Sequence, residues 1–477
     1  MNSTRLIAMF GMALLAACGG GGGGEVAGID GGGTPTPVAG VVSKGTITGF
    51  GSVIVNGVHY DSNGADITID DNPGLESDLA VGDVVIVKGT LGSSGTSGSA
   101  DSIAFFDAVE GPITAIDSTA GTIIVLGQTV IVDDATSFDD SISPASIFGL
   151  SVGDIVEVAG FFRTDGSISA TRIEPKLPGG EFEVTGTISN LTATTFQLNS
   201  LVVDYSAAML ADFPGGTPAV GQPVEAKGSQ LGGAGQLLAT RVEFKGNELT
   251  GDAGDRFEVE GFIANFMAAT EFEVEGVAVT TNGQTLYENG VAGDLADNRK
   301  VEVEGDLNTA GVLVAEKIEF KQGSYIRIEA TVGEVQATTL TLLGVVVNVN
   351  IATRFEDKSD ARVLQFDLAD VNVGDYVAIR GYEDSSGIVA TQLERDDPRN
   401  DVSLRGFVET VADPQFTILG VTVVTNAPGV STVFRDVDES AIAAGTFFGQ
   451  ALDRLVEAKG TLSNGQILAE EVQLENQ

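Results

Sequence analysis

The sequence predicts an all-β protein in which six small β-barrels follow one another along the chain. Two observations predict this fold, and a third concerns the segment that comes before the repeats. Four short sequence elements recur six times, and the central small residues of the first element are 66 to 76 residues apart. The elements alternate apolar and polar residues, which is typical of half-buried strands. An apolar stretch that ends at the one cysteine of the chain precedes the repeats.

The first element is an N-terminal export signal. Leu6 to Ala17 are apolar or glycine, follow Arg5, and end in Leu15-Ala16-Ala17-Cys18. The stretch is too short for a stable transmembrane anchor. It resembles the lipobox of bacterial lipoproteins, which implies that residues 1–17 are removed and that Cys18 is lipidated. An ordinary buried thiol is disfavoured, because Cys18 stands outside every foldable segment.

Gly19 after this cysteine resembles the sorting signal for the outer membrane of Gram-negative bacteria. The sequence therefore predicts a lipid-anchored protein of the cell envelope, held at the outer membrane on its periplasmic or surface face. Residues 18–41 contain a run of six glycines and a Thr-Pro-Thr-Pro segment. We expect them to form a flexible tether with a reach of roughly 25 Å.

The remaining chain divides into six copies of one unit. Each copy opens with a strand around a small residue, here Gly45, Gly111, Gly186, Gly261, Ala330 and Gly406. A second strand turns at Gly57, Gly127, Ser200, Gly276, Gly344 or Gly420. The third element reads VGDVVIVKG in copy one and VGDIVEVAG in copy two, and the fourth reads ATRIE in copy two. The predicted repeats are residues 42–106, 107–176, 177–246, 255–322, 323–397 and 398–477.

Four or five strands in about 70 residues fit a small closed barrel, because closure removes exposed strand edges. We expect an OB-like five-stranded barrel, with an SH3-like barrel as the alternative. In segments such as Val156-Glu157-Val158 the apolar side chains should form the core and the carboxylates should face water. A short helix is expected within Lys358 to Leu368, and neighbouring repeats should pack together because each core is small.

Together, the lipobox, the tether and the VGDxVxVxG and ATRIE elements resemble an uncharacterised bacterial family. Its members carry tandem copies of an OB-like domain of unknown function in Gram-negative lipoproteins. The resemblance covers residues 42–477. It implies the repeat fold and no assigned activity, so no catalytic or binding residues follow from it.

Composition excludes several classes of function. The formal net charge is −42, which opposes binding to nucleic acid. One cysteine and one histidine exclude an internal disulfide and a histidine-rich or thiolate metal site. No cofactor motif occurs, so none is expected.

Two kinds of residue are candidates for a functional role. His59 is interpreted as a surface or half-buried strand residue, since no second histidine exists to share a site. The aspartate of the third element recurs as Asp83, Asp154 and Asp375, but other copies have Gln222, Arg299 or Arg454 there. A residue with a structural role in a turn can be replaced by glutamine or arginine, whereas a catalytic or metal-binding aspartate cannot, so a turn role is favoured.

Acidic pairs occur between strands, where loop carboxylates suit Ca²⁺. They are Asp70-Asp71, Asp133-Asp134, Asp139-Asp140, Asp252 with Asp255, and Asp396-Asp397. None fits a calcium-loop pattern, so solvated loops are favoured and specific Ca²⁺ binding stays open.

The sequence predicts no catalytic, cofactor-binding or metal residue. We expect a non-enzymatic envelope lipoprotein that acts as a scaffold, a spacer or an interaction module for another envelope protein. A glycan- or divalent-cation-binding lipoprotein is the alternative, although tryptophan platforms for sugars are absent. An enzyme with an unrecognised site is the third and weakest reading.

Overall fold

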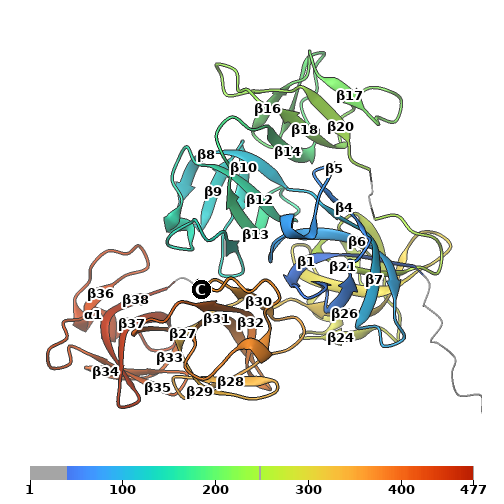
Figure 1. Cartoon of the computed structure of the whole chain (residues 1–477). Helices are drawn as coiled ribbons and strands as arrows, with labels where there is room; N and C mark the ends of the chain where they lie inside the picture. The colour runs from blue at the N-terminus through green and yellow to red at the C-terminus, as the bar shows by residue number, and fades with distance from the viewer. Residues whose placement is uncertain (1–39, 247–248, 476–477) are drawn as a thin grey trace, which may run out of the picture. The chain divides into compact units, whose positions relative to one another are not determined.

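A computed structural model describes residues 40–246 and 249–475, and nearly all of its regular structure is β-strand (Figure 1). Cys18 and the predicted signal peptide and tether lie outside these residues, apart from the last two residues of the tether. The single α-helix of the described ranges is α1 (Ala444–Gln450). None of the helices there has the length and hydropathy that a membrane span requires.

Every repeat contributes the same five strands in the same order. In repeats 1 and 2 they are β1 (Gly40–Gly49), β2 (Val53–Val55), β3 (Val58–Asp61), β6 (Val84–Leu91) and β7 (Ser97–Phe105), then β8 (Val109–Asp117), β9 (Thr122–Val125), β10 (Gln128–Ile131), β12 (Ile155–Phe162) and β13 (Ile168–Pro175). In repeats 3 and 4 they are β14 (Phe182–Thr187), β15 (Thr195–Leu198), β16 (Leu201–Asp204), β18 (Pro223–Gly228) and β19 (Leu237–Leu238) with β20 (Arg241–Phe244), then β21 (Arg256–Ala268), β22 (Glu271–Val274), β23 (Val277–Thr280), β25 (Lys300–Leu307) and β26 (Leu313–Phe320). In repeats 5 and 6 they are β27 (Ile326–Val335), β28 (Thr339–Leu342), β29 (Val345–Asn348), β31 (Tyr376–Asp384) and β32 (Gly387–Asp396), then β33 (Asp401–Ala412), β34 (Gln415–Ile418), β35 (Val421–Thr425), β37 (Leu455–Ser463) and β38 (Gln466–Leu474).

The strand pairing closes each barrel. In repeat 1, β1 pairs with β2, β2 with β3, β3 with β7 in parallel, β7 with β6, and β6 again with β1. Repeats 2, 4, 5 and 6 follow the same order. This Greek-key order confirms the OB-like prediction over the SH3-like alternative. Repeat 3 departs from it, because its last strand is split and β15, β16 and β19 form a separate sheet.

Short strands follow the third barrel strand, and one in each repeat pairs in parallel with the last strand. They are β4 (Asp66–Ile69), β5 (Asn72–Pro73), β11 (Ser137–Phe138), β17 (Met209–Ala211), β24 (Leu286–Glu288), β30 (Arg354–Asp357) and β36 (Val433–Arg435). The expected helix in Lys358 to Leu368 is absent, and only a 3₁₀ turn at Leu368–Asp370 forms there. The reason is Asp357, whose carboxylate accepts from the Val363 amide at 2.8 Å and from the Arg395 guanidinium. These bonds hold the segment in a loop.

The glycine that ends the third element marks a β-bulge. In repeat 1 the register of β6 against β7 shifts between Lys88 and Gly89. A Cβ atom on Gly89 would lie 3.0 Å from the Ala100 Cα and closer still to the Ser99 carbonyl oxygen. Corresponding clashes with backbone atoms occur at Gly160, Gly228, Gly305, Gly381 and Gly460. The strand therefore bends at this glycine and continues through it.

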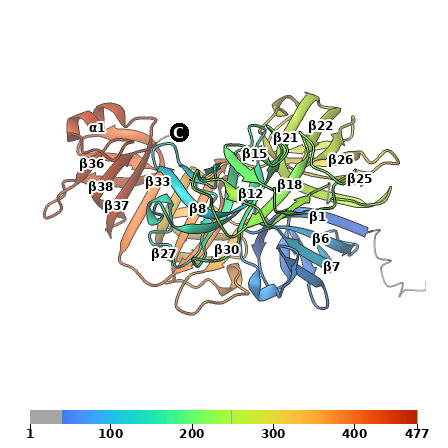
Figure 2. The same cartoon turned by 90° about the horizontal axis from the view of Figure 1, so that it is seen from above.

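Barrels join in pairs through their first strands. β1 runs parallel to β21, which joins repeat 1 to repeat 4 (Figure 1, Figure 2). β8 pairs with β14 and β27 pairs with β33, so repeats 2 and 3 share a sheet, as do repeats 5 and 6. The hydrophobic cores of these two consecutive pairs are continuous. Packing of neighbours is thus found, but repeat 1 shares its sheet with repeat 4 rather than with repeat 2.

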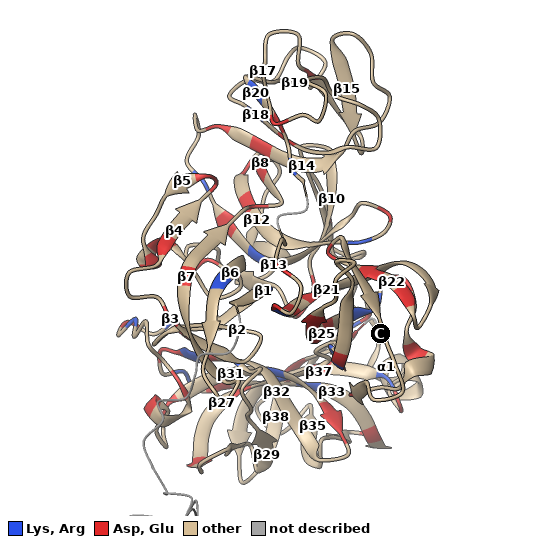
Figure 3. Ribbon diagram, turned by 90° about the vertical axis from the view of Figure 1, so that its right-hand side faces the viewer, with Lys and Arg blue, Asp and Glu red and all other residues tan. Residues whose placement is uncertain are grey.

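The prediction that the strand carboxylates face water is wrong at several positions. The exposed fractions of Glu157, Glu258 and Glu302 are 8%, 3% and 3%. Each side chain does point away from its own barrel core, as the alternation predicts, but other strands and other repeats cover that outer side. Acidic residues therefore lie along strands as well as in loops (Figure 3).

Candidate functional site

The residues singled out in the repeat elements have structural partners. His59 is exposed on β3, and its Nδ1 lies 3.2 Å from the Ser52 hydroxyl oxygen. Asp83 accepts a hydrogen bond from the Ala80 amide at 2.7 Å, three residues earlier. Asp154 and Asp375 make the same turn bond, and so does Gln222 in repeat 3. The predicted turn role of this position is confirmed.

Most of the acidic pairs bind basic side chains rather than gathering into a site. Asp134 pairs with Arg405, Asp140 with Arg362 and Asp396 with Arg399. Asp139 lies 3.4 Å from Arg172, and Asp255 accepts from the Asp252 amide at 2.7 Å. Asp70 and Asp71 lie among carboxylates from other repeats, and Asp71 also pairs with Lys245 at 3.0 Å.

The carboxylates around Asp70 form what we term the Asp107 cluster, which consists of Asp70, Asp107, Glu110, Glu157 and Glu183. Oxygen atoms of Asp70, Asp107 and Glu183 lie within 4.8 Å of one another. Oxygen atoms of Asp107, Glu110 and Glu157 do so too, so that Asp107 belongs to both groups. Three repeats contribute to the cluster.

Strand register brings three of these side chains into line. Glu157 on β12 is directly opposite Glu110 on β8, and Glu110 is opposite Glu183 on β14. Opposed like charges on neighbouring strands destabilise a sheet unless another group neutralises them. Asp107 precedes β8, and its backbone amide donates to Asp70 Oδ1 at 3.3 Å, which draws in the loop after β4.

Asp107 is the centre of this cluster and has no partner for its charge. Its exposed fraction is 3%, and neither carboxylate oxygen accepts a hydrogen bond from any residue in the described ranges. Burial raises the pKa of Asp107 well above its ordinary value, and the carboxylates of Glu183 and Asp70 raise it further. Burial, with the neighbouring Glu225, also raises the pKa of Glu183 to about 10.

Lysines compensate part of the negative charge at the edges of the cluster. Lys176 Nζ lies 2.6 Å from Glu157, and Lys227 Nζ lies 2.7 Å from Glu183. Even so, burial raises the pKa of Glu157 to about 7. Asp107 lines a cavity of about 390 Å³ together with the buried Glu225. Such a set of oxygen ligands can hold a Ca²⁺ ion or share protons.

Sequence reasoning singled out Asp70 but missed the other four members of the cluster. The signal available was the recurrent glutamate of the alternating strands, as in Val156-Glu157-Val158. That signal was interpreted as solvent-facing, since one strand does not reveal what covers its outer side.

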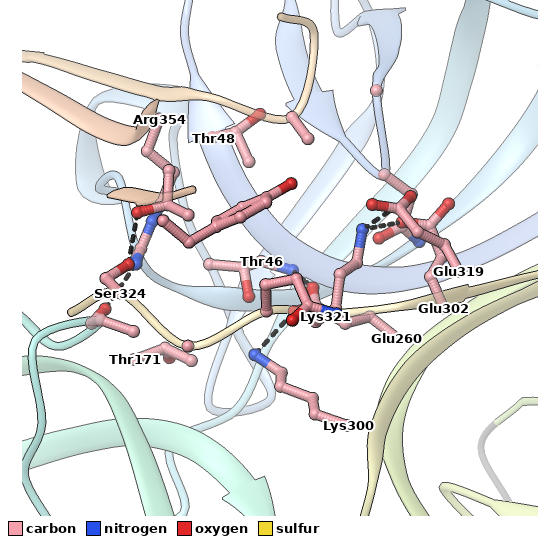
Figure 4. A pocket seen from close by; sticks show the side chains of 18 of the residues that line it. Thr46, Thr48, Thr171, Glu260, Lys300, Glu302, Glu319, Lys321, Ser324 and Arg354 are labelled. Carbon is pink, nitrogen blue, oxygen red and sulfur yellow. Dashed lines mark hydrogen bonds and ion pairs between the residues drawn. The ribbon is translucent and has the colours of Figure 1, made fainter. Parts of the chain in front are cut away.

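A second cavity, of about 320 Å³, is lined by repeats 1, 2, 4 and 5 and contains several buried charged side chains (Figure 4). None of the residues considered as single sites in the sequence lines it, apart from Asp133.

A comparison with curated proteins finds no match. A family model described as a domain of unknown function (DUF5666) matches six successive stretches of the chain. They are residues 39–103, 110–174, 185–243, 254–319, 327–394 and 405–473. Because these stretches cover most of the sequence and coincide with the six barrels, the chain belongs to this family of domains of unknown function.

Proposed function

We propose that this protein is a non-enzymatic lipoprotein of the bacterial cell envelope that acts as a scaffold or interaction module. The observation that carries the proposal is the pairing of barrels through their first strands. Backbone hydrogen bonds between β1 and β21, β8 and β14, and β27 and β33 make two barrels into one continuous sheet. Joined barrels hold their surfaces in fixed relation, which suits a scaffold.

The joints also protect the barrels from unwanted association. The N-terminal half of the first strand in each barrel has only one neighbour within that barrel. In repeat 1 this neighbour of β1 is β6, and the other edge of β1 is open to a strand of another barrel. An unpaired strand edge attracts other chains. In the paired barrels this edge is filled by a strand of the same chain, so partners are left to bind through side chains rather than through open edges.

The anchor of the scaffold is the lipid expected on Cys18. The experiment is a comparison of wild type and Cys18→Ser in fractionated cells of a Gram-negative host. Wild type should be in the outer-membrane fraction and incorporate labelled fatty acid, and Cys18→Ser should lose both. Gly19→Asp is a matched control, which should keep the lipid but remain in the inner membrane. Membrane retention of Cys18→Ser without a lipid would contradict the anchor.

Cross-linking in whole cells tests the scaffold itself. The anchored protein should form reproducible cross-links to a defined envelope component, and these should weaken in Cys18→Ser. Conversion of a small-molecule substrate by the purified chain would overturn the non-enzymatic proposal.

A divalent-cation site is the second candidate function, and Asp107 is the observation that favours it. A buried carboxylate without a partner is costly, and a cation between Asp70, Asp107 and Glu183 would remove that cost. Ca²⁺ suits the site, because it accepts irregular sets of oxygen ligands. A glycan partner remains an alternative for the envelope role.

Calorimetric titration of the soluble chain with CaCl₂ tests this site. Wild type should bind Ca²⁺. Asp107→Asn should weaken binding at least about tenfold, because Asp107 is the one residue common to the Asp70–Asp107–Glu183 set and the Asp107–Glu110–Glu157 set. Asp101→Asn on β7 is the control, since Asp101 is exposed. No heat at millimolar Ca²⁺, with the carboxylates protonated instead, would reject the cation site.

A further inference from the structure

The cavity between repeats 1, 2, 4 and 5 contains an arginine without a counter-ion. Arg354 begins β30, and its exposed fraction is 8%. Its guanidinium donates to the Ala135 carbonyl oxygen at 2.5 Å and to the Ser137 hydroxyl at 3.5 Å. Both acceptors are uncharged, and these bonds use two of the five N–H groups.

The other buried basic residues of residues 40–246 and 249–475 all have an acidic partner. Arg172, Lys227 and Arg380 each have a carboxylate oxygen within 4.0 Å. Arg354 has none at this distance in the same ranges. Burial lowers the pKa of Arg354, and the nearby Arg380 lowers it further. Burial of an unpaired charge is strongly unfavourable, so an anion that pairs with Arg354 in the cavity would be favoured.

A second guanidinium faces the same cavity. Arg163 belongs to repeat 2 and lies over the ring of Phe262 at 5.0 Å from the ring centre. No carboxylate of the described chain lies within ion-pair distance of Arg163 either. Two arginines from different repeats thus line one cavity with their charges unmatched by acidic side chains, in a chain of net charge −42.

Two hydroxyl groups of the cavity also lack partners. Thr46 Oγ1 and Thr171 Oγ1 are buried and form no hydrogen bond in the described structure. In Figure 4, Thr171 lies near Ser324 and Arg354 on one side of the pocket. Hydroxyl groups both donate and accept hydrogen bonds, so these two can bind polar groups of a ligand whose charged group pairs with Arg354.

Three of the four acidic residues of the lining are paired with lysines, namely Glu260, Glu302 and Glu319, and the fourth, Asp133, is exposed. Glu260 lies 2.7 Å from Lys300 and accepts from the Thr46 amide at 2.9 Å. Burial by itself would raise the pKa of Glu260, but Lys300 and Lys321 outweigh it and hold the pKa at about 2. Lys321 also pairs with Glu302 at 2.6 Å. These ion pairs lie across the pocket from Arg354 in Figure 4.

We propose that this cavity binds a small hydroxylated organic monoanion, whose carboxylate pairs with Arg354 and whose hydroxyl groups bond to Thr46 and Thr171. Sugar acids belong to this class. A carboxylate fits the planar guanidinium, and one negative charge suits a lining with five basic and four acidic residues. A doubly charged phosphate would exceed this single surplus positive charge. The cavity volume of about 320 Å³ lies within the range of small-molecule sites. This site depends neither on the scaffold proposal nor on the Asp107 cluster.

Calorimetric titration of the soluble six-repeat chain tests the proposal with D-glucuronate, D-glucose and sulfate as probes. D-glucuronate should bind, and D-glucose, which has the same ring without the charge, should bind at least about tenfold more weakly. Arg354→Gln should weaken D-glucuronate binding at least about tenfold. Arg299→Gln is the matched control, because Arg299 is an exposed arginine outside the cavity lining.

Arg354→Gln could also disturb the contact with Ala135, so a second variant separates binding from folding. Thr171→Val removes a buried hydroxyl that has no partner, and the chain should keep or raise its unfolding temperature. The same variant should weaken D-glucuronate binding severalfold. Equal binding of D-glucose and D-glucuronate, binding of sulfate alone, no binding at millimolar D-glucuronate, or unchanged binding in both variants would each overturn the proposal.

Discussion

The side chain of Asn56 covers Gly45. A Cβ atom on Gly45 would lie 2.7 Å from the Asn56 Cγ, and Asn56 Nδ2 donates to the Lys44 carbonyl oxygen at 3.0 Å. Asn56 and Gly57 both have positive φ, as a tight hairpin turn requires. Repeat 2 has the same relationship between Gly111 and Leu126. The glycine of the first strand therefore leaves room for the first residue of the next turn.

Replacing Gly111 with alanine should destabilise repeat 2. The new Cβ atom would lie 2.7 Å from the Leu126 Cδ1, and relieving such overpacking costs about 1–3 kcal/mol. Thermal unfolding followed by circular dichroism should show a lower first midpoint. Gly283→Ala is the control, because no heavy atom lies within 4 Å of a Cβ there. Equal midpoints for the two variants would refute the contact.

Replacing Val42 with aspartate should disturb repeat 4 although Val42 belongs to repeat 1. Val42 packs in the core of repeat 4, and its exposed fraction is 5%. An unpaired charge there should raise hydrogen exchange in β21 and β25. Val53→Asp is the comparison, because Val53 lies in the core of repeat 1. Unchanged exchange in β21 after Val42→Asp would show that the two barrels are not joined as described.

Removing the Arg380 guanidinium should release the loop of repeat 2 that follows β10. Arg380 Nη1 donates to the Asp134 carbonyl oxygen at 3.1 Å and to the Thr136 carbonyl oxygen at 2.9 Å. Arg380→Ala leaves these acceptors unpaired, which costs about 1–3 kcal/mol for each buried group. Hydrogen exchange around residues 133–140 should increase, and Arg380→Lys should restore part of the protection. Full protection in Arg380→Ala would argue against this contact.

Stability should fall as pH rises from about 5 to 8. Burial raises the pKa of Asp83 to about 7 in spite of Arg172, and burial raises that of Glu157 to about 7 despite Lys176. In this window the folded chain binds more protons than the unfolded chain, so the free energy of unfolding decreases with increasing pH. Urea unfolding at several pH values measures this. Asp83→Asn should flatten the slope, and an unchanged slope would contradict the assignment.

Stability should also fall below pH 4.5, for the opposite reason. The lysines beside Glu260 hold its pKa at about 2 against the effect of burial. Its contribution is complete above the ordinary glutamate pKa and is lost as pH falls towards 2. The same unfolding series, extended to pH 2, should show that Glu260→Gln loses less stability on acidification than wild type. An equal loss in both would remove Glu260 from this effect.

The sequence by itself determined the unit of this protein. Recurrent glycines mark a bulge at Gly89 and a hairpin turn at Gly57, and strand alternation defines which side chains enter each barrel core. These features depend on backbone sterics and on local burial, and both are written in short stretches of sequence. The repeat number, the all-β class and the OB-like barrel were therefore predictable, as was the turn role of Asp83.

Only the tertiary structure decided what covers the outer side of each barrel. Alternation in Val156-Glu157-Val158 predicts that Glu157 points away from the core, but not that β8 and β14 bring Glu110 and Glu183 beside it. The joining of repeat 1 to repeat 4 likewise depends on strand edges far apart in the chain. Arg354 is an ordinary charged residue in the sequence and an unpaired cation once four repeats enclose it. Burial of a charge is a property of the assembled surfaces, and no local pattern encodes it.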